Sequence, residues 1–434
     1  MLALVVTFCV QMLASFVLGT PAVLAPVVAP EIGFTPERVG LFVGVAYLMA
    51  MLSGLWSGHG VARLGAVGLS QVAMLACALG AFASTAATVW LLFAAAIAIG
   101  CGYGIINPAS TILLEHHSPG KRRSLFFSIK QTGVPMGVAL AGLLMPWGLT
   151  RIGWQASVAL AGLVCAVTSL VLFPGVRRLR TPSVRTAALR SASAAHRQVD
   201  DATGMPVGAS GRSQTRVPGM SGTSAGAEDA PAVVRAGPAA LWLVLRDPVL
   251  RRLSLTSLTF ATTQLVFLTF LVSLLNLQLG HTLAWAAGIL AAAQVVSTMA
   301  RIGLGYVADR WLDAALLLGL LGLAMAASLV GLALLRPGSA DWVVLAAATF
   351  CSATGMGWNG VYFAELARTA RRRADLATVA GASQFFTFAG SMLGPVVFAG
   401  IIRAGGSWSL GFALFALLPA ASGAALLRAW ARSR

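Results

Sequence analysis

The sequence is poor in charged residues, and in acidic residues above all. Charged side chains make up 10% of the 434 residues and only 13 are Asp or Glu, whereas 58% are hydrophobic. Soluble globular domains have about 25% charged residues, so this composition excludes an ordinary water-soluble protein. Every Asp and Glu lies at the end of a long apolar stretch, in a turn or in a polar central segment. The apolar stretches therefore hold no carboxylate at mid-depth.

The sequence also lacks the motifs of several function classes. Its five cysteines occur singly in separate apolar stretches, without the spacing of a zinc, redox or disulfide framework. We find no nucleophile triad and no phosphate-binding Walker loop. The run Gly100-x-Gly102-x-Gly104 follows no strand, so it is not a dinucleotide fingerprint. We therefore expect neither an enzyme nor an ATP-driven pump, and no metal or cofactor.

Long apolar stretches dominate what is present. They run for roughly 19 to 27 residues, enough to cross a ~30 Å hydrocarbon core as helices. Helices satisfy their own backbone hydrogen bonds in lipid, and the stretches lack the alternation of barrel strands. The sequence thus predicts an all-α membrane protein with twelve transmembrane helices. We place them near 2–28, 38–58, 66–84, 88–114, 124–149, 154–174, 252–278, 283–307, 312–335, 341–366, 376–402 and 407–430.

The basic charge of the chain follows the expected topology. The net charge is +17, with 30 Lys and Arg residues. The turns on one side of the membrane hold only Arg38, Arg151, Arg336 and Arg403. The other side holds the remaining turn residues, the central segment and the basic C-terminus. By the positive-inside rule, both termini and the central segment are predicted to be cytoplasmic. We expect no nucleic-acid partner.

The two halves of the chain repeat each other. At an offset of 253 residues Gln11 aligns with Gln264, Gly102 with Gly355, Gln131 with Gln384 and Gly137 with Gly390. Such a repeat predicts two pseudo-symmetric six-helix bundles, residues 1–175 and 248–434. Residues 176–247 are rich in Arg, Ser, Ala, Gly and Pro, and we expect them to form a disordered cytoplasmic linker.

A motif is repeated in the turns after the second and eighth stretches. The later copy reads Gly305-Tyr-Val-Ala-Asp309-Arg310, and the earlier reads Gly58-His-Gly-Val-Ala62-Arg63-Leu-Gly65. Both resemble the cytoplasmic-loop signature of the major facilitator superfamily, Gly-x-x-x-Asp-Arg-x-Gly. The later copy lacks the trailing glycine, and the earlier has Ala62 at the acidic position. The resemblance implies a gating role for Gly58, Arg63, Gly305, Asp309 and Arg310.

The fifth and eleventh stretches carry a second resemblance. Gly133-Val-Pro-Met-Gly137 and Gly390-Ser-Met-Leu-Gly394-Pro395 are similar to the fifth-helix element of the superfamily, where small residues and proline accompany domain rocking. The resemblance covers the chain outside the linker. It implies the major facilitator fold, a monomer in a bacterial inner membrane, and secondary transport by alternating access.

Two cations lie well inside the apolar stretches. Lys130 lies seven residues beyond Arg123, about 10 Å along a helix, and Arg301 lies eight before Asp309, about 12 Å. In the superfamily the fifth and eighth helices are neighbours, so the resemblance implies that both cations converge on one small anion. Arg301 also resembles the eighth-helix arginine of monocarboxylate transporters and oxalate:formate antiporters, whose guanidinium binds a carboxylate. Structural alternatives are bonds from Arg301 to span-end carbonyls or Asp309, and a Lys130 that reaches the interface.

Uncharged polar residues complete the predicted site. Because the superfamily lines its cavity with helices 1, 4, 7 and 10, the resemblance implies substrate contacts at four of the amides, with two more on helices 5 and 11. Amides also bridge helices without binding a substrate. Tyr103, Trp358 and Phe260 are either cavity walls or plain packing. The six amides are Gln11, Asn107, Gln131, Gln264, Asn359 and Gln384.

These observations predict a secondary active transporter of a small organic anion, a carboxylate, coupled to a proton or a counter-anion. Two alternatives remain. An exporter of hydrophobic compounds would share the fold, but the sequence lacks the acidic mid-membrane residue suited to cationic drugs. A substrate sensor that does not transport would usually need a folded signalling domain, and the linker shows none.

Overall fold

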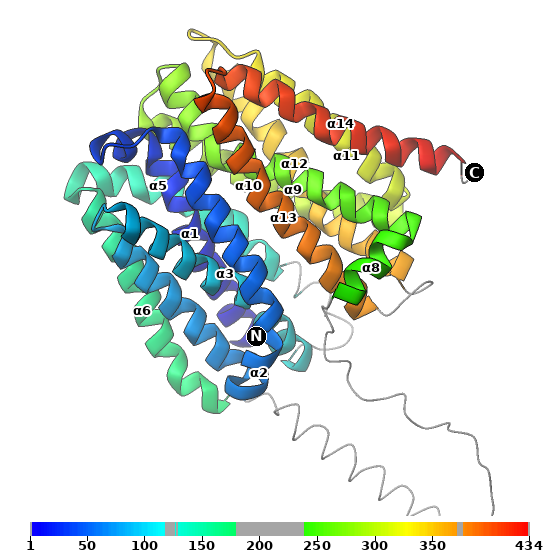
Figure 1. The fold of residues 1–434 in the computed structure, drawn as a ribbon, viewed down its shortest axis with the longest axis horizontal. Helices are drawn as coiled ribbons and strands as arrows, with labels where there is room; N and C mark the ends of the chain where they lie inside the picture. Colours follow the sequence, from blue (N-terminus) through cyan, green and yellow to red (C-terminus); the bar gives the residue numbers. More distant parts are fainter. Residues whose placement is uncertain (1, 118–125, 127–128, 179–237, 371–375, 433–434) are drawn as a thin grey trace, which may run out of the picture.

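The chain forms two helical bundles that lie side by side (Figure 1). The structure is a computed structural model and describes residues 2–117, 126, 129–178, 238–370 and 376–432. The first bundle consists of α1 (Leu2–Glu31), α2 (Val39–Ser84), α3 (Val89–His117), α5 (Gly133–Ile152) and α6 (Trp154–Arg178), with a short 3-10 turn η1 (Pro36–Arg38) before α2.

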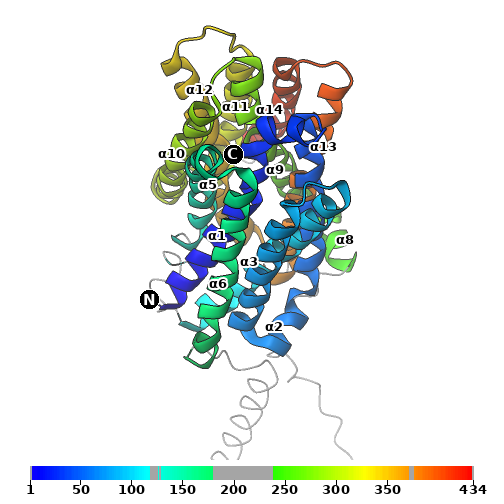
Figure 2. The same cartoon turned by 90° about the vertical axis from the view of Figure 1, so that its left-hand side faces the viewer.

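The second bundle repeats this arrangement. It consists of α9 (Pro248–Ser273), the π-helical turn η3 (Leu274–Gln278), α10 (Leu283–Arg310), α11 (Ala314–Ala333), α12 (Asp341–Ala370), α13 (Leu376–Arg403) and α14 (Trp408–Arg432). In the view turned by 90°, α1, α2, α3 and α6 of the first bundle lie in the lower part of the picture and α11, α12 and α14 of the second lie in the upper part (Figure 2).

The helices confirm the predicted membrane fold. In the described part of the chain, 11 helical segments are long and apolar enough to cross a membrane, and α2 supplies two of them, Pro36–Ser57 and Arg63–Ser84. The 30-residue helix α12 completes the set of twelve, although glycines and polar residues lower its hydropathy. The fold is therefore all-α with twelve spans.

The turn expected after the second span lies inside α2. The helix is interrupted at Gly65, where the backbone has φ 74° and ψ 169°. Glycine adopts this conformation without the clash that a Cβ would cause. One glycine thus separates the second span from the third.

The repeat seen in the sequence corresponds to equivalent packing in space. A Cβ at Gly137 in α5 would collide with the carbonyl oxygen of Met12 in α1. A Cβ at Gly390 in α13 would collide with the carbonyl oxygen of Leu258 in α9. The fifth span thus packs closely on the first, and the eleventh packs in the same way on the seventh.

Two helix pairs form the seam between the bundles: α5 with α10, and α2 with α13. In the first pair, a Cβ at Gly142 would lie 2.6 Å from the carbonyl oxygen of Ala287. In the second, a Cβ at Gly40 would overlap the carbonyl oxygen of Pro395 and lie 2.9 Å from the ring of Phe270. The α2–α13 contact lies at the end of the molecule predicted to be extracytoplasmic, and it closes the seam there.

The end of the predicted linker differs from the expectation. Residues 238–246 form helix α8 (Pro238–Arg246), which packs against α13. Asp247 then caps α9, because its side-chain oxygen accepts hydrogen bonds from the backbone N–H groups of Val249 and Leu250 at 2.8 and 3.1 Å. The linker residues 179–237 lie outside the described residues.

Replacing Gly40 tests the α2–α13 contact. We expect Gly40→Ala to lower the free energy of unfolding by about 1–3 kcal/mol, because the added methyl group meets backbone that cannot rotate away. The control is Gly400→Ala on α13, where an added Cβ has no atom within 4 Å. Thermal unfolding of the purified variants measures both, and equal stability of the two would contradict the contact.

Candidate functional site

Arg301 and Lys130 lie on the two spans that pack together as α10 and α5. The close approach at Gly142 holds the two helices side by side, and nearer the predicted cytoplasmic end Arg301 reaches across the seam. The Nη1 atom of Arg301 donates to the backbone carbonyl oxygen of Gln131, 3.3 Å away. Arg301 therefore contacts the residue that follows Lys130, and the two spans are neighbours as the superfamily resemblance implied.

Lys130 is buried and points into the first bundle. Its side chain is 2% exposed, and its Nζ donates to Oδ1 of Asn107 in α3 at 2.5 Å. The structure thus places the ammonium against an amide oxygen and not at the membrane interface. Asn107, predicted to contact the substrate, is a partner of Lys130.

Arg301 keeps part of its hydrogen-bonding capacity free. Its Nε is buried and has no hydrogen-bond partner in the part of the chain that the structure describes. The guanidinium also interacts electrostatically with Tyr103 of α3. Because a guanidinium carries five N–H donors in a planar fork, an oxygen-bearing ligand can still be bound.

No carboxylate compensates these two charges among the described residues. The ion pair found there joins Arg368 to Glu365, with an Nη2–Oε1 distance of 2.8 Å. Glu365 is the buried carboxylate of the described chain, and Nε of Arg368 binds its second oxygen at 2.9 Å. Uncompensated cations in a membrane-spanning segment are costly, so Lys130 and Arg301 are candidate functional residues.

A small central cavity lies between the bundles, and neither Lys130 nor Arg301 is among the residues that line it. Its volume is about 60 Å³, and Tyr47, Tyr103, Ser15 and Gln264 provide polar groups on its wall. The rings of Tyr47 and Tyr103 meet edge to face with centroids 5.9 Å apart. Small-molecule sites usually measure about 300–1,000 Å³. The cavity is therefore smaller than the usual site for a small organic molecule.

Buried polar atoms without partners surround α5. Within the described residues, Gln11 and Ser15 on α1 and Gln294 and Ser297 on α10 have buried side-chain atoms that form no hydrogen bond. Such atoms are rare in folded proteins because each one loses its bonds to water. Their position on the two helices that flank α5 marks this region as one that gains partners when the molecule opens or binds a ligand.

The predicted amides do not act as one set. Gln264 lines the central cavity, and its Oε1 accepts hydrogen bonds from Nε1 of Trp358 at 3.1 Å and Nδ2 of Asn359 at 3.4 Å. These bonds link α9 to α12, so Asn359 positions Gln264. Gln384 on α13 is half-buried and does not line the central cavity.

The three aromatic residues that the sequence singled out also lie in different surroundings. Tyr103 lies on the cavity wall, as one reading of the sequence held. Phe260 and Trp358 pack edge to face inside the second bundle with ring centroids 5.6 Å apart.

The residues of the repeated motif lie at helix ends or kinks. Gly305 and Arg310 belong to the last turns of α10, where Arg310 is exposed and stacks on Tyr306 at 5.6 Å. Gly305 has no atom within 4 Å of an added Cβ, so it makes no close helix contact in this conformation. Arg63 is exposed in α2. Gly58 lies in the same helix, and the side-chain surroundings of Gly58 and Asp309 lie outside the described residues.

Sequence reasoning missed Tyr47. It lies on α2, packs against Tyr103 and contacts the ring of Phe388 on α13 at a centroid distance of 6.2 Å. It therefore belongs to the cavity wall and to the second seam pair at once. The signal available in the sequence was that tyrosine is rare in this chain, which has 4 tyrosines. Two of them, Tyr47 and Tyr103, are buried at the central cavity.

The fold defines a multi-pass helical membrane protein. The chain belongs to the Major Facilitator Superfamily, whose model matches residues 7–395. It is similar to the gallate transporter of Pseudomonas putida, with 30% identity over 200 residues, which are 44% of this chain and 42% of that protein. It is also similar to the 4-hydroxybenzoate transporter PcaK of Pseudomonas aeruginosa, with 27% identity over 150 residues, 34% of each chain.

The matched segments span less than half the length of either relative. The family and both named relatives identify a transporter of small molecules and not an enzyme. The superfamily resemblance found in the sequence motifs is thereby confirmed.

Asn107 provides a test of the Lys130 environment. We expect Asn107→Leu to destabilise the protein by about 1–3 kcal/mol or more, because it leaves a buried ammonium without its acceptor. The double variant Asn107→Leu/Lys130→Met removes both partners, and we expect it to regain most of the lost stability. Thermal unfolding of the purified proteins measures this, and a double variant as unstable as the single one would contradict the pairing.

Proposed function

We propose that this protein transports a small organic anion, a carboxylate, with Arg301 and Lys130 as the binding cations. The observation that carries the proposal is that Arg301 reaches across the seam to the backbone of Gln131, the neighbour of Lys130, while no carboxylate of the described chain pairs with either cation. A carboxylate would accept hydrogen bonds from the free edge of the guanidinium and offset both charges. Gln131 and the amides of Gln11 and Gln264 would provide uncharged contacts around it.

The cavity wall and the relatives favour an aromatic acid. Tyr47 and Tyr103 present ring surfaces, and Gln264 and Ser15 offer groups that bind hydroxyls. The named relatives transport gallate and 4-hydroxybenzoate, both of which join a carboxylate to a hydroxylated ring. We therefore include hydroxylated benzoates in the proposed substrate class.

Transport proceeds by alternating access in this proposal. The central cavity of about 60 Å³ cannot hold such a molecule, so the bundles have to separate along one seam pair at a time. Gly58, Arg63, Gly305, Asp309 and Arg310 would stabilise one orientation at the cytoplasmic end. A proton or counter-anion would complete the cycle. We place the protein in a bacterial inner membrane as a monomer with both termini cytoplasmic.

The exporter of hydrophobic cations is less well supported. It would use an unpaired buried carboxylate, whereas Glu365 is bound by Arg368 through both oxygens. The sensor alternative gains no support from the described residues, since α8 is the helix found there at the end of the linker.

Variants of Arg301 provide the first test of the proposal. Arg301→Lys keeps the charge but loses the planar fork, so we expect the affinity for 4-hydroxybenzoate to fall about ten- to hundredfold, in line with ~1.5–3 kcal/mol for a hydrogen bond to a charged group. Arg301→Gln should lose more, and Lys130→Gln should weaken the same ligand. Equilibrium binding to purified protein provides the measurement, and exposed Arg336→Gln is the control. Unchanged affinity in folded Arg301→Gln protein would reject the anion site.

Asp309 tests the gating assignment. We expect Asp309→Asn to slow uptake into proteoliposomes while substrate affinity changes by less than about tenfold, ~1.4 kcal/mol. The reason is that a residue at the cytoplasmic end of α10 acts on the equilibrium between the two orientations and does not touch the substrate. A large loss of affinity with normal cycling would move Asp309 into the binding site.

A further inference from the structure

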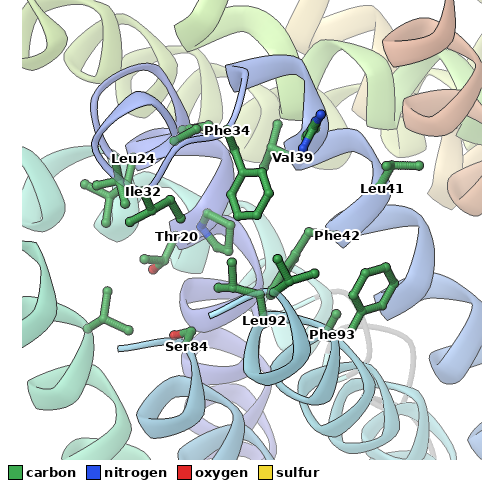
Figure 3. Close-up of a pocket in the computed structure, with 18 of the residues that line it drawn as sticks. Thr20, Leu24, Ile32, Phe34, Val39, Leu41, Phe42, Ser84, Leu92 and Phe93 are labelled. Carbon is green, nitrogen blue, oxygen red and sulfur yellow. The ribbon is translucent and has the colours of Figure 1, made fainter. Parts of the chain in front are cut away.

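A second and larger cavity lies in the first bundle, away from the two cations. Its volume is about 290 Å³, and it is enclosed by α1, α2, α3, α6 and the turn that joins α1 to α2. Figure 3 shows Phe34, Phe42, Leu92 and Phe93 around this space. All of these segments meet at the end of the molecule predicted to be extracytoplasmic. The volume is that of a small ligand site, and the proposed transport path does not use it.

The cavity is amphipathic. Apolar side chains form nearly all of its wall, whereas two cations, Arg38 and Arg403, lie on its edge. The guanidinium of Arg38 stacks on the ring of Phe34 at 5.2 Å, which holds its charge at the cavity. Arg403 comes from the end of α13, so the second bundle contributes one of the two charges. An apolar space with a cationic edge fits a molecule that has an apolar body and an anionic head.

Trp154 gives an independent indication of a ligand. It is the first residue of α6, lines the cavity and is 5% exposed. Its indole Nε1–H is buried and has no hydrogen-bond partner among the residues that the structure describes. A buried indole usually finds an acceptor because the unpaired N–H has lost its bond to water. The atom is closed to water in this conformation, so the ring has to turn before a carboxylate or carbonyl oxygen of a bound molecule can supply the acceptor.

The cavity is accessible from the side of the molecule as well as from its end. Three apolar residues of its wall are exposed: Leu41 at 37%, Val89 at 44% and Phe93 at 45%. In a chain that spans a membrane, such a surface faces lipid. A ligand with an apolar body can therefore enter from the outer half of the bilayer while its anionic head stays near the arginines.

We propose that this cavity is a binding site for an amphipathic anion, held by Arg38 and Arg403 through its head and by the Trp154 indole N–H through an oxygen. The site is distinct from the seam cations and does not depend on the transport proposal. Two sources share this chemistry: a free carboxylate with an apolar body, and an anionic lipid of the surrounding membrane.

The experiment uses full-length protein with Arg301→Gln, which removes carboxylate binding at the seam. In phosphatidylcholine nanodiscs, binding of decanoate and of benzoate is measured by calorimetry. In a second arm, retention of phosphatidylglycerol is measured by native mass spectrometry. Trp154→Phe keeps the apolar ring and removes only the N–H, and we expect binding to weaken about three- to tenfold. Arg38→Gln/Arg403→Gln should weaken it tenfold or more.

Matched controls are Trp147→Phe, an exposed tryptophan outside the cavity, and Arg336→Gln, in another turn on the same predicted side. Both should bind like the parent. Carboxylate binding that depends on Trp154 supports the site with a free acid as its ligand, and retained phosphatidylglycerol that depends on Trp154 supports it with a lipid. The proposal would be overturned if the folded protein bound neither the carboxylates nor phosphatidylglycerol. It would also be overturned if the parent, Trp154→Phe and the double arginine variant all bound the ligands equally well.

Discussion

The constraint on which the site depends is the presence of two positive charges, a buried Lys130 and a partly exposed Arg301, that no carboxylate of the described chain pairs with. The protein offsets these charges only in part, with the amide of Asn107 and the carbonyl oxygen of Gln131. The two residues belong to different bundles, and Arg301 reaches across the α5–α10 seam to Gln131. In the proposed function, an anion bound by both cations would stabilise the closed seam and so couple binding to the position of the bundles.

The number of spans and the halves of the molecule could be predicted from the sequence because both follow from apolar length and repetition. The close packing of Gly137 and Gly390 also followed from the repeat. Local backbone geometry could not be predicted in the same way. The separation of the second and third spans rests on one dihedral pair at Gly65, and α8 lies in a segment whose composition resembles a linker. The hydropathy pattern predicted neither the interruption at Gly65 nor helix α8.

The approach of Arg301 to the Lys130 segment was predictable because depth along a helix can be counted in residues. The roles of the amides were not predictable, because sequence does not give the rotation of each helix about its axis. Gln264 and Asn359 bind each other, Asn107 holds Lys130, and Gln11 has no partner among the described residues. Six residues that look alike in sequence therefore have at least three different environments. Tyr47 was missed because nothing in its surrounding apolar stretch indicates that it faces another tyrosine.

The two seam pairs differ in a way that bears on the direction of opening. The α2–α13 pair is closed by contact between glycine and backbone at Gly40 and Pro395, and the atoms in that contact carry no net charge. The α5–α10 pair carries Arg301 and lies next to buried atoms that lack partners on α1 and α10. Separation of the first pair costs packing alone, whereas separation of the second brings water to charges and unpaired polar groups. The energy of the second pair is therefore the one that an anionic ligand can change most.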